Sequence, residues 1–180
     1  MSEFSESYHL RGTDIDEGVA LVRRSGLKGY VFPPANGWIP IVIADHSFAP
    51  DQRVVSQNTG TLLHFVSAED HGWTFALFEG DKAVSAYDCG WDDDVRVDLS
   101  RYAKAPIAEM LGVEADRAIA AIEAVLHPAD IDAAIDSQPA QTFAEAMRLP
   151  RFEWFAYDYV ARDYHEQPSD YIGVVKVGDQ

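Results

Sequence analysis

WTFALFEGDKAVSAYDC, residues 73–89, is the stretch that decides the fold, because two apolar runs flank the pair Gly80-Asp81. Such a pair forms the tight turn of a two-stranded hairpin. The register that follows is Glu79 opposite Lys82, Leu77 opposite Val84, Phe75 opposite Ala86 and Trp73 opposite Asp88. Directly opposed residues share a face of the sheet. We therefore expect one apolar face and one more polar face, as in antiparallel sheets.

Three further strands precede this hairpin, at residues 27–32, 38–45 and 61–67. The loop PPANG joins the first two runs at a length typical of hairpins. Pro40 lacks a backbone N–H, so it favours either an edge position or a late start for the second strand. Residues 67–75, SAEDHGWTF, contain a polar turn between two strands, although Asp70 and His71 also have the chemistry of a site.

The N-terminal region divides into an arm and a helix. Residues 1–12 are polar and unpatterned, so we expect a loose arm. Asp14 can cap a helix that ends at Gly26.

After residue 98 alanine becomes common, and the β-branched runs vanish. The spacing of apolar residues predicts short helices, at residues 106–112, 113–127, 128–137, 139–149 and 151–164. A final strand is expected at residues 171–177, on a free sheet edge.

These patterns predict an α+β fold. A mostly antiparallel sheet of about five to six strands carries a C-terminal cluster of short helices on one face. We expect one domain over residues 13–180, with a sheet-rich part at 27–98, a helix-rich part at 99–165 and the final strand.

The charge of the chain limits its partners. Thirty acidic residues against 14 basic ones give a net charge of −16, which repels nucleic acid and anionic membranes. A basic protein would instead be attracted. Cys89 is the only cysteine, so no internal disulfide is expected. No signal segment or membrane span is visible, and we expect a soluble cytoplasmic protein whose oligomeric state the sequence leaves open.

A metal site is one functional hypothesis. Histidine and carboxylate groups suit zinc, iron or manganese, and a meander could gather His46, Asp70, His71 and Asp88 at one end of the sheet. No spacing typical of metal enzymes occurs in the chain.

Other catalytic motifs are missing from the sequence. It has neither a G-x-S-x-G elbow nor a phosphate-binding glycine loop. Asp88 beside Cys89 disfavours the thiolate, so Cys89 is expected to fill space. We expect no cofactor.

The densest acidic run, WDDDVRVD at residues 91–98, fails the calcium-loop template because it lacks the central glycine. It is the best candidate docking surface, with Asp92, Asp93 and Asp94 as the charges and Trp91 as an aromatic anchor. Trp154 and Tyr157, from an aromatic helix, would extend it.

The sequence therefore favours a non-enzymatic module, of an inhibitor, immunity or regulatory kind, that binds a basic partner. The alternative is a metal-dependent hydrolase that uses the four His and Asp residues above. A third hypothesis is a ligand pocket between sheet and helices, lined by Trp73, Phe75 and Phe155.

Overall fold

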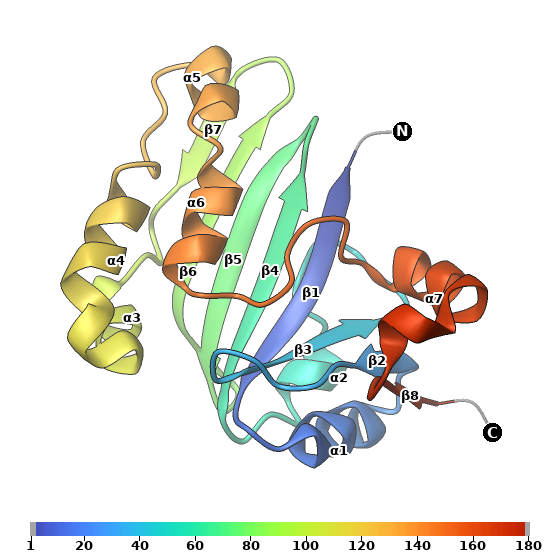
Figure 1. Ribbon diagram of the computed structural model, residues 1–180. Coiled ribbons are helices and arrows are strands. Elements are labelled where there is room, and N and C mark those ends of the chain that lie inside the picture. Colours follow the sequence, from blue (N-terminus) through green and yellow to red (C-terminus); the bar gives the residue numbers. More distant parts are fainter. Residues whose placement is uncertain (1–2, 179–180) are drawn as a thin grey trace.

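A computed structural model describes residues 3–178. Its centre is one open antiparallel sheet with the strand order β7-β6-β5-β4-β1-β3-β2-β8 (Figure 1). The strands are β1 (Phe4–Arg11), β2 (Gly29–Val31), β3 (Trp38–Ile43), β4 (Thr61–Ala68), β5 (Gly72–Glu79), β6 (Lys82–Trp91), β7 (Val95–Asp98) and β8 (Val175–Val177). The α+β class is confirmed, with more strands than expected.

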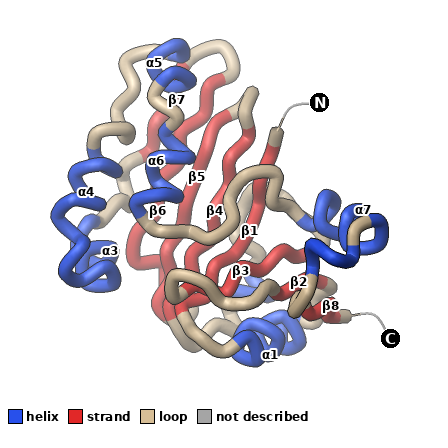
Figure 2. Tube along the Cα trace, viewed as in Figure 1, coloured by secondary structure: helices blue, strands red, loops and turns tan. Residues whose placement is uncertain are grey.

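Helices cover both faces of the sheet (Figure 2). They are α1 (Ile15–Ser25), α2 (Gln52–Val55), α3 (Lys104–Leu111), α4 (Ala115–Glu123), α5 (Ile131–Asp136), α6 (Pro139–Ala146) and α7 (Tyr157–Glu166), with 3-10 turns at Gly112–Glu114 and Pro168–Tyr171. The C-terminal helices α3 to α7 lie on one face, as expected. On the other face α1 and α2 share a core with side chains of β1 to β3.

The N-terminal arm is a wrong prediction. Residues 4–11 form β1, which pairs with both β3 and β4 inside the sheet. Its polar side chains Ser5, Ser7 and His9 are buried, so their polarity hides the strand pattern from the sequence. Residues 1–2 of the predicted arm lie outside the described residues.

The hairpin of β5 and β6 forms, but its predicted register holds only near the turn. Glu79 pairs with Lys82 as expected, whereas Leu77 pairs with Ser85 and Trp73 pairs with Cys89. The register shifts by one residue between Leu77 and Phe78, at a β-bulge that leaves Val84 of β6 without a partner on β5. A shift of one residue moves every later side chain to the other face, so Asp88 lies opposite Thr74 and not opposite Trp73.

Pro40 lies in an interior strand that begins at Trp38, so the expected edge position and the late strand start are both wrong. β3 runs between β1 and β2. The Pro40 carbonyl accepts the N–H of Phe32, one residue beyond the end of β2. The side of Pro40 that lacks an N–H thus faces the point where β2 leaves the ladder. The sheet therefore loses little backbone hydrogen bonding at this position.

The remaining differences concern element ends. The acidic run at residues 91–98 comprises the last residue of β6, a turn and the edge strand β7. The predicted helix at 151–164 begins only at Tyr157, because Trp154 has a positive φ of 48°. The final strand shortens to Val175–Val177 and pairs with β2 at the other edge. The first helix is confirmed, with Asp14 and Gly26 as its caps.

Candidate functional site

Two turns meet at one end of the sheet, and they contain most of the predicted docking residues. The β4–β5 turn holds Glu69, Asp70 and His71, while the β6–β7 turn holds residues 92–94. His71 Nδ1 lies 3.0 Å from Asp92 Oδ1, and the Trp91 N–H donates to the His71 carbonyl at 3.0 Å. The stretch SAEDHGWTF is therefore a hairpin turn held against a second turn.

The carboxylates of the β6–β7 turn are exposed. Asp92 also accepts a hydrogen bond of 2.8 Å from Arg96 Nη2. The hydrogen bond with His71, followed by the charges of His71 and Arg96, lowers the pKa of Asp92. Asp94 accepts the N–H of Val95 at 2.8 Å. These hydrogen bonds hold the carboxyl groups of Asp92 and Asp94 in place.

Trp91 cannot be the aromatic anchor. Its side chain is only 7% exposed and packs in the core beneath the helices. Its ring N–H donates to the carbonyl of Glu69 at 3.1 Å. Because alternate residues of a strand face opposite sides, Trp91 shares the helix-covered face with Tyr87 and Cys89.

Trp154, unlike Trp91, is exposed. Its side chain is 48% exposed, and its N–H donates to Glu3 Oε1 at 3.0 Å. The N–H of Glu3 in turn donates to Glu69 Oε2 at 3.1 Å. Trp154 is thereby tied to the β4–β5 turn. Tyr157 is half-buried, with its ring 5.5 Å from that of Tyr30.

The four predicted metal ligands do not come together. His46 Nε2 pairs with Asp158 at 3.2 Å, His71 pairs with Asp92, and Asp88 lies across from Asp98 on β7. Within residues 3–178 no three His, Cys, Asp or Glu side chains are placed to share an ion. The sheet is not a simple meander, because β1 lies between β3, which precedes His46, and β4, which precedes Asp70 and His71.

The predicted ligand pocket is also absent from its expected place. Phe75 stacks on Phe143 of α6 at 4.3 Å between ring centroids, and Trp73 packs beside the same ring. Phe155 belongs to a separate cluster under α7, against Phe32. All three predicted lining residues fill the core.

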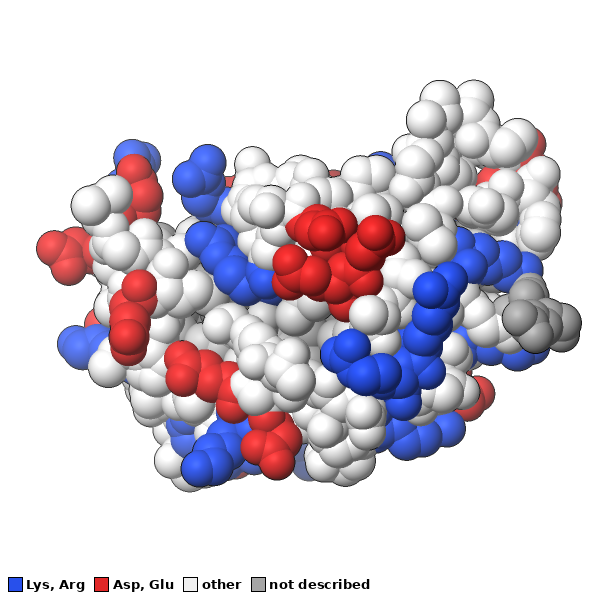
Figure 3. All heavy atoms as spheres, turned by 90° about the horizontal axis from the view of Figure 1, so that it is seen from below, with Lys and Arg blue, Asp and Glu red and all other residues white. Residues whose placement is uncertain are grey.

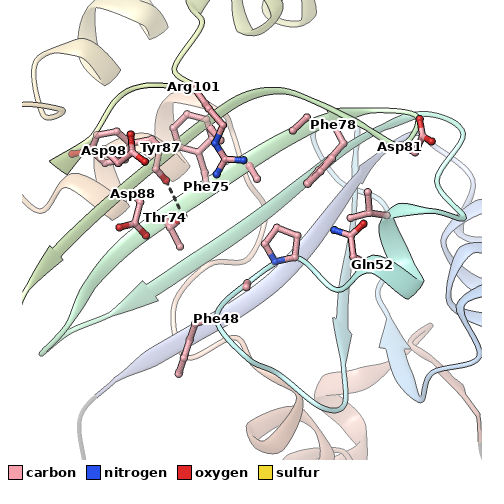
Figure 4. Close-up of a pocket in the computed structure, with 16 residues that line it drawn as sticks. Phe48, Gln52, Thr74, Phe75, Phe78, Asp81, Tyr87, Asp88, Asp98 and Arg101 are labelled. Carbon is pink, nitrogen blue, oxygen red and sulfur yellow. Dashed lines mark hydrogen bonds between the residues drawn. The ribbon is translucent and has the colours of Figure 1, made fainter. Parts of the chain in front are cut away.

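A groove occurs instead on the opposite face of the sheet, between the loop that follows β3 and strands β5 to β7 (Figure 4). Its volume is about 500 Å³, and its lining includes Phe48, Thr74, Ala76, Asp88, Asp98 and Arg101. A neighbouring cavity of about 280 Å³ shares Phe48, Thr74 and Asp88 with it.

Phe48 forms the outer wall of this groove in a strained conformation. It is 46% exposed and has a φ of 58°, a left-handed backbone that costs about 1–3 kcal/mol for a bulky residue. Its N–H donates to Glu6 Oε2 at 3.0 Å, and the other oxygen of Glu6 lies 3.1 Å from His64 Nε2. Glu6 and His64 are both buried, so a buried pair holds Phe48 in place.

The inner wall of the groove carries two carboxylates on neighbouring strands. Asp88 of β6 lies directly opposite Asp98 of β7, and like charges in such positions destabilise a sheet. Partial burial, followed by the charge of Asp98, raises the pKa of Asp88. A hydrogen bond with Ser100 lowers the pKa of Asp98. The groove is thus negative, with Arg101 at its rim.

Comparison with protein-family models, with curated proteins and with solved structures finds no match to this chain. Among the described residues, no helix has the length and apolar character needed to span a membrane.

Sequence reasoning missed Phe48 and Arg101, which lie in loops without any motif. It assigned Asp88 to a metal site and Asp98 to the acidic run, whereas the two carboxylates lie opposite each other on β6 and β7 and line the groove together. A signal was available in the small residues Thr74, Ala76 and Ala86, which leave only Phe78 as a bulky side chain on that part of the hairpin.

Proposed function

We propose that this chain is a non-enzymatic binding protein that recognises a basic protein partner. Its docking surface is the acidic end of the sheet, defined as Glu3, Glu69, Asp70, Asp92, Asp93 and Asp94. The observation that carries the proposal is the contact of the β4–β5 and β6–β7 turns, through the His71–Asp92 pair at 3.0 Å. This contact gathers carboxylates from separate parts of the chain.

Trp154 supports this proposal as the aromatic residue of the surface. It is exposed and tied through Glu3 to the acidic end. Exposed tryptophan beside charged groups is typical of interface residues that contribute much of the binding energy.

The distribution of charge also supports the acidic end. Figure 1 places both turns at the upper end of the sheet. Figure 3 shows the molecule from below, that is, from the end opposite to these turns. On this face, clusters of Lys and Arg lie beside clusters of Asp and Glu. With an excess of 16 negative charges in the chain, a basic partner would be steered toward acidic regions.

The test is capture of partners from a cell lysate, followed by association kinetics of the captured protein at a series of salt concentrations. The triple change Asp92→Asn, Asp93→Asn and Asp94→Asn should slow association about threefold or more at low salt and flatten its salt dependence.

The matched control makes the same change in charge at exposed sites of α3, the adjoining 3-10 turn and α4: Glu109→Gln, Glu114→Gln and Asp116→Asn. It should slow association less than the first triple change does. Equal effects of the two triple changes, or none from either, would contradict docking at the acidic end.

A further inference from the structure

The groove behind Phe48 is a second surface, on a face of the sheet that α1 and α2 leave partly open. Phe48, Thr74 and Asp88 line both the 500 Å³ and the 280 Å³ cavities. These three residues therefore stand where the two cavities join into one groove, with the Phe48 loop running alongside β5 and β6 (Figure 4).

Two features that oppose folding meet in this groove. Phe48 is a bulky exposed residue in a left-handed backbone conformation, and Asp88 faces a second carboxylate across the β6–β7 ladder. Departures from good local design concentrate at functional sites.

Asp88 has no hydrogen-bond or ion-pair partner among residues 3–178. Arg96 and Arg101 lie near enough to favour its charged form, but neither forms an ion pair with it. Three carboxylates, Asp81, Asp88 and Asp98, line the groove against one guanidinium. The groove is therefore complementary to a cation.

We infer that the groove receives an arginine side chain of the basic partner, with the guanidinium against the ring of Phe48 and donating hydrogen bonds to Asp88. This inference rests on the proposed function and names the chemistry of one contact. Arginine fits better than lysine, because its planar guanidinium both stacks on an aromatic ring and donates to a carboxylate in a fork.

The probe is N-acetyl-arginine methylamide, titrated into ¹⁵N-labelled protein and followed by NMR. The neutral analogue N-acetyl-citrulline methylamide has nearly the same shape and serves as its control. Arginine should shift the amide signals of Phe48, Thr74 and Asp88, and citrulline should shift them much less.

Three variants of groove residues and one control variant outside the groove make the test more specific. Asp88→Asn should weaken arginine binding about threefold or more. Phe48→Gly should weaken it similarly, because it removes the ring but suits the left-handed backbone. Arg101→Gln should strengthen binding, since it removes a competing guanidinium from the rim. Glu109→Gln, at an exposed site of α3 outside the groove, should leave the affinity unchanged.

Equal shifts from the two probes, shifts centred on another surface, or unchanged affinity in Asp88→Asn would each overturn the inference. Slower partner association in the Asp92–Asp94 variant, without arginine binding in the groove, would support the acidic end and refute the groove. Arginine binding in the groove, with partner association unaffected by that variant, would refute the acidic end and support the groove.

Discussion

At the scale of single residues, the polar side chains of β1 have the clearest consequences. His9 is fully buried on the helix-covered face, where its Nε2 lies 3.0 Å from Ser7 Oγ. Its Nδ1 has no hydrogen-bond partner among the described residues. Burial, with a smaller contribution from the charge of His64, lowers the pKa of His9 to about 3.

This pKa predicts a loss of stability in acid. The unfolded chain binds a proton at His9 below its ordinary pKa of 6.5, whereas the folded protein does not until about pH 3. The stabilisation is complete above pH 6.5 and declines as the pH falls, by about 2 kcal/mol between pH 7 and pH 5.

Urea unfolding of the wild type and of His9→Gln at the two pH values checks this expectation. The wild type should lose about 2 kcal/mol more than the variant over that interval. An equal loss in both proteins would show that His9 takes up a proton in the folded state.

At the scale of elements, strands β5 and β6 approach closely where the β4–β5 turn ends. Gly72 has a φ of 132°, and a Cβ atom there would lie 2.0 Å from the carbonyl oxygen of Cys89. Gly72 pairs with Gly90 of β6. The glycine in SAEDHGWTF is therefore required by the contact between strands.

Gly72→Ala should lower the free energy of unfolding by at least about 2 kcal/mol, because it combines backbone strain with a clash. Gly60→Ala is the matched control, since its Cβ would meet no atom closer than 3.8 Å. The control should change stability by less than about 1 kcal/mol. Denaturant unfolding measures both, and equal values would contradict the close approach.

At the scale of the whole molecule, the net charge of −16 opposes the compact state through self-repulsion. Salt screens this repulsion. Raising NaCl from about 20 mM to about 500 mM should therefore increase the Tm by about 2–5 °C. Thermal melts in the two buffers test this, and a Tm that falls with salt would show that attractive ion pairs outweigh the repulsion.

The sequence by itself determined the α+β class, the capped helix at residues 15–25, the tight turn at Gly80-Asp81 and the helical C-terminal half. All of these depend on local signals: the spacing of apolar residues, capping side chains and turn residues. The acidic run is also a local feature of the sequence. For this reason its composition alone was enough to make it a candidate docking surface.

Only the tertiary structure decided the place of β1, the bulge in β6 and the groove. The Ser and His residues of β1 are buried through pairing with strands far along the chain, which no local pattern encodes. The bulge moved Asp88 to the open face, and packing buried Trp91 while Trp154 stayed exposed. Long-range pairing selects among registers that local propensity leaves almost equal in free energy.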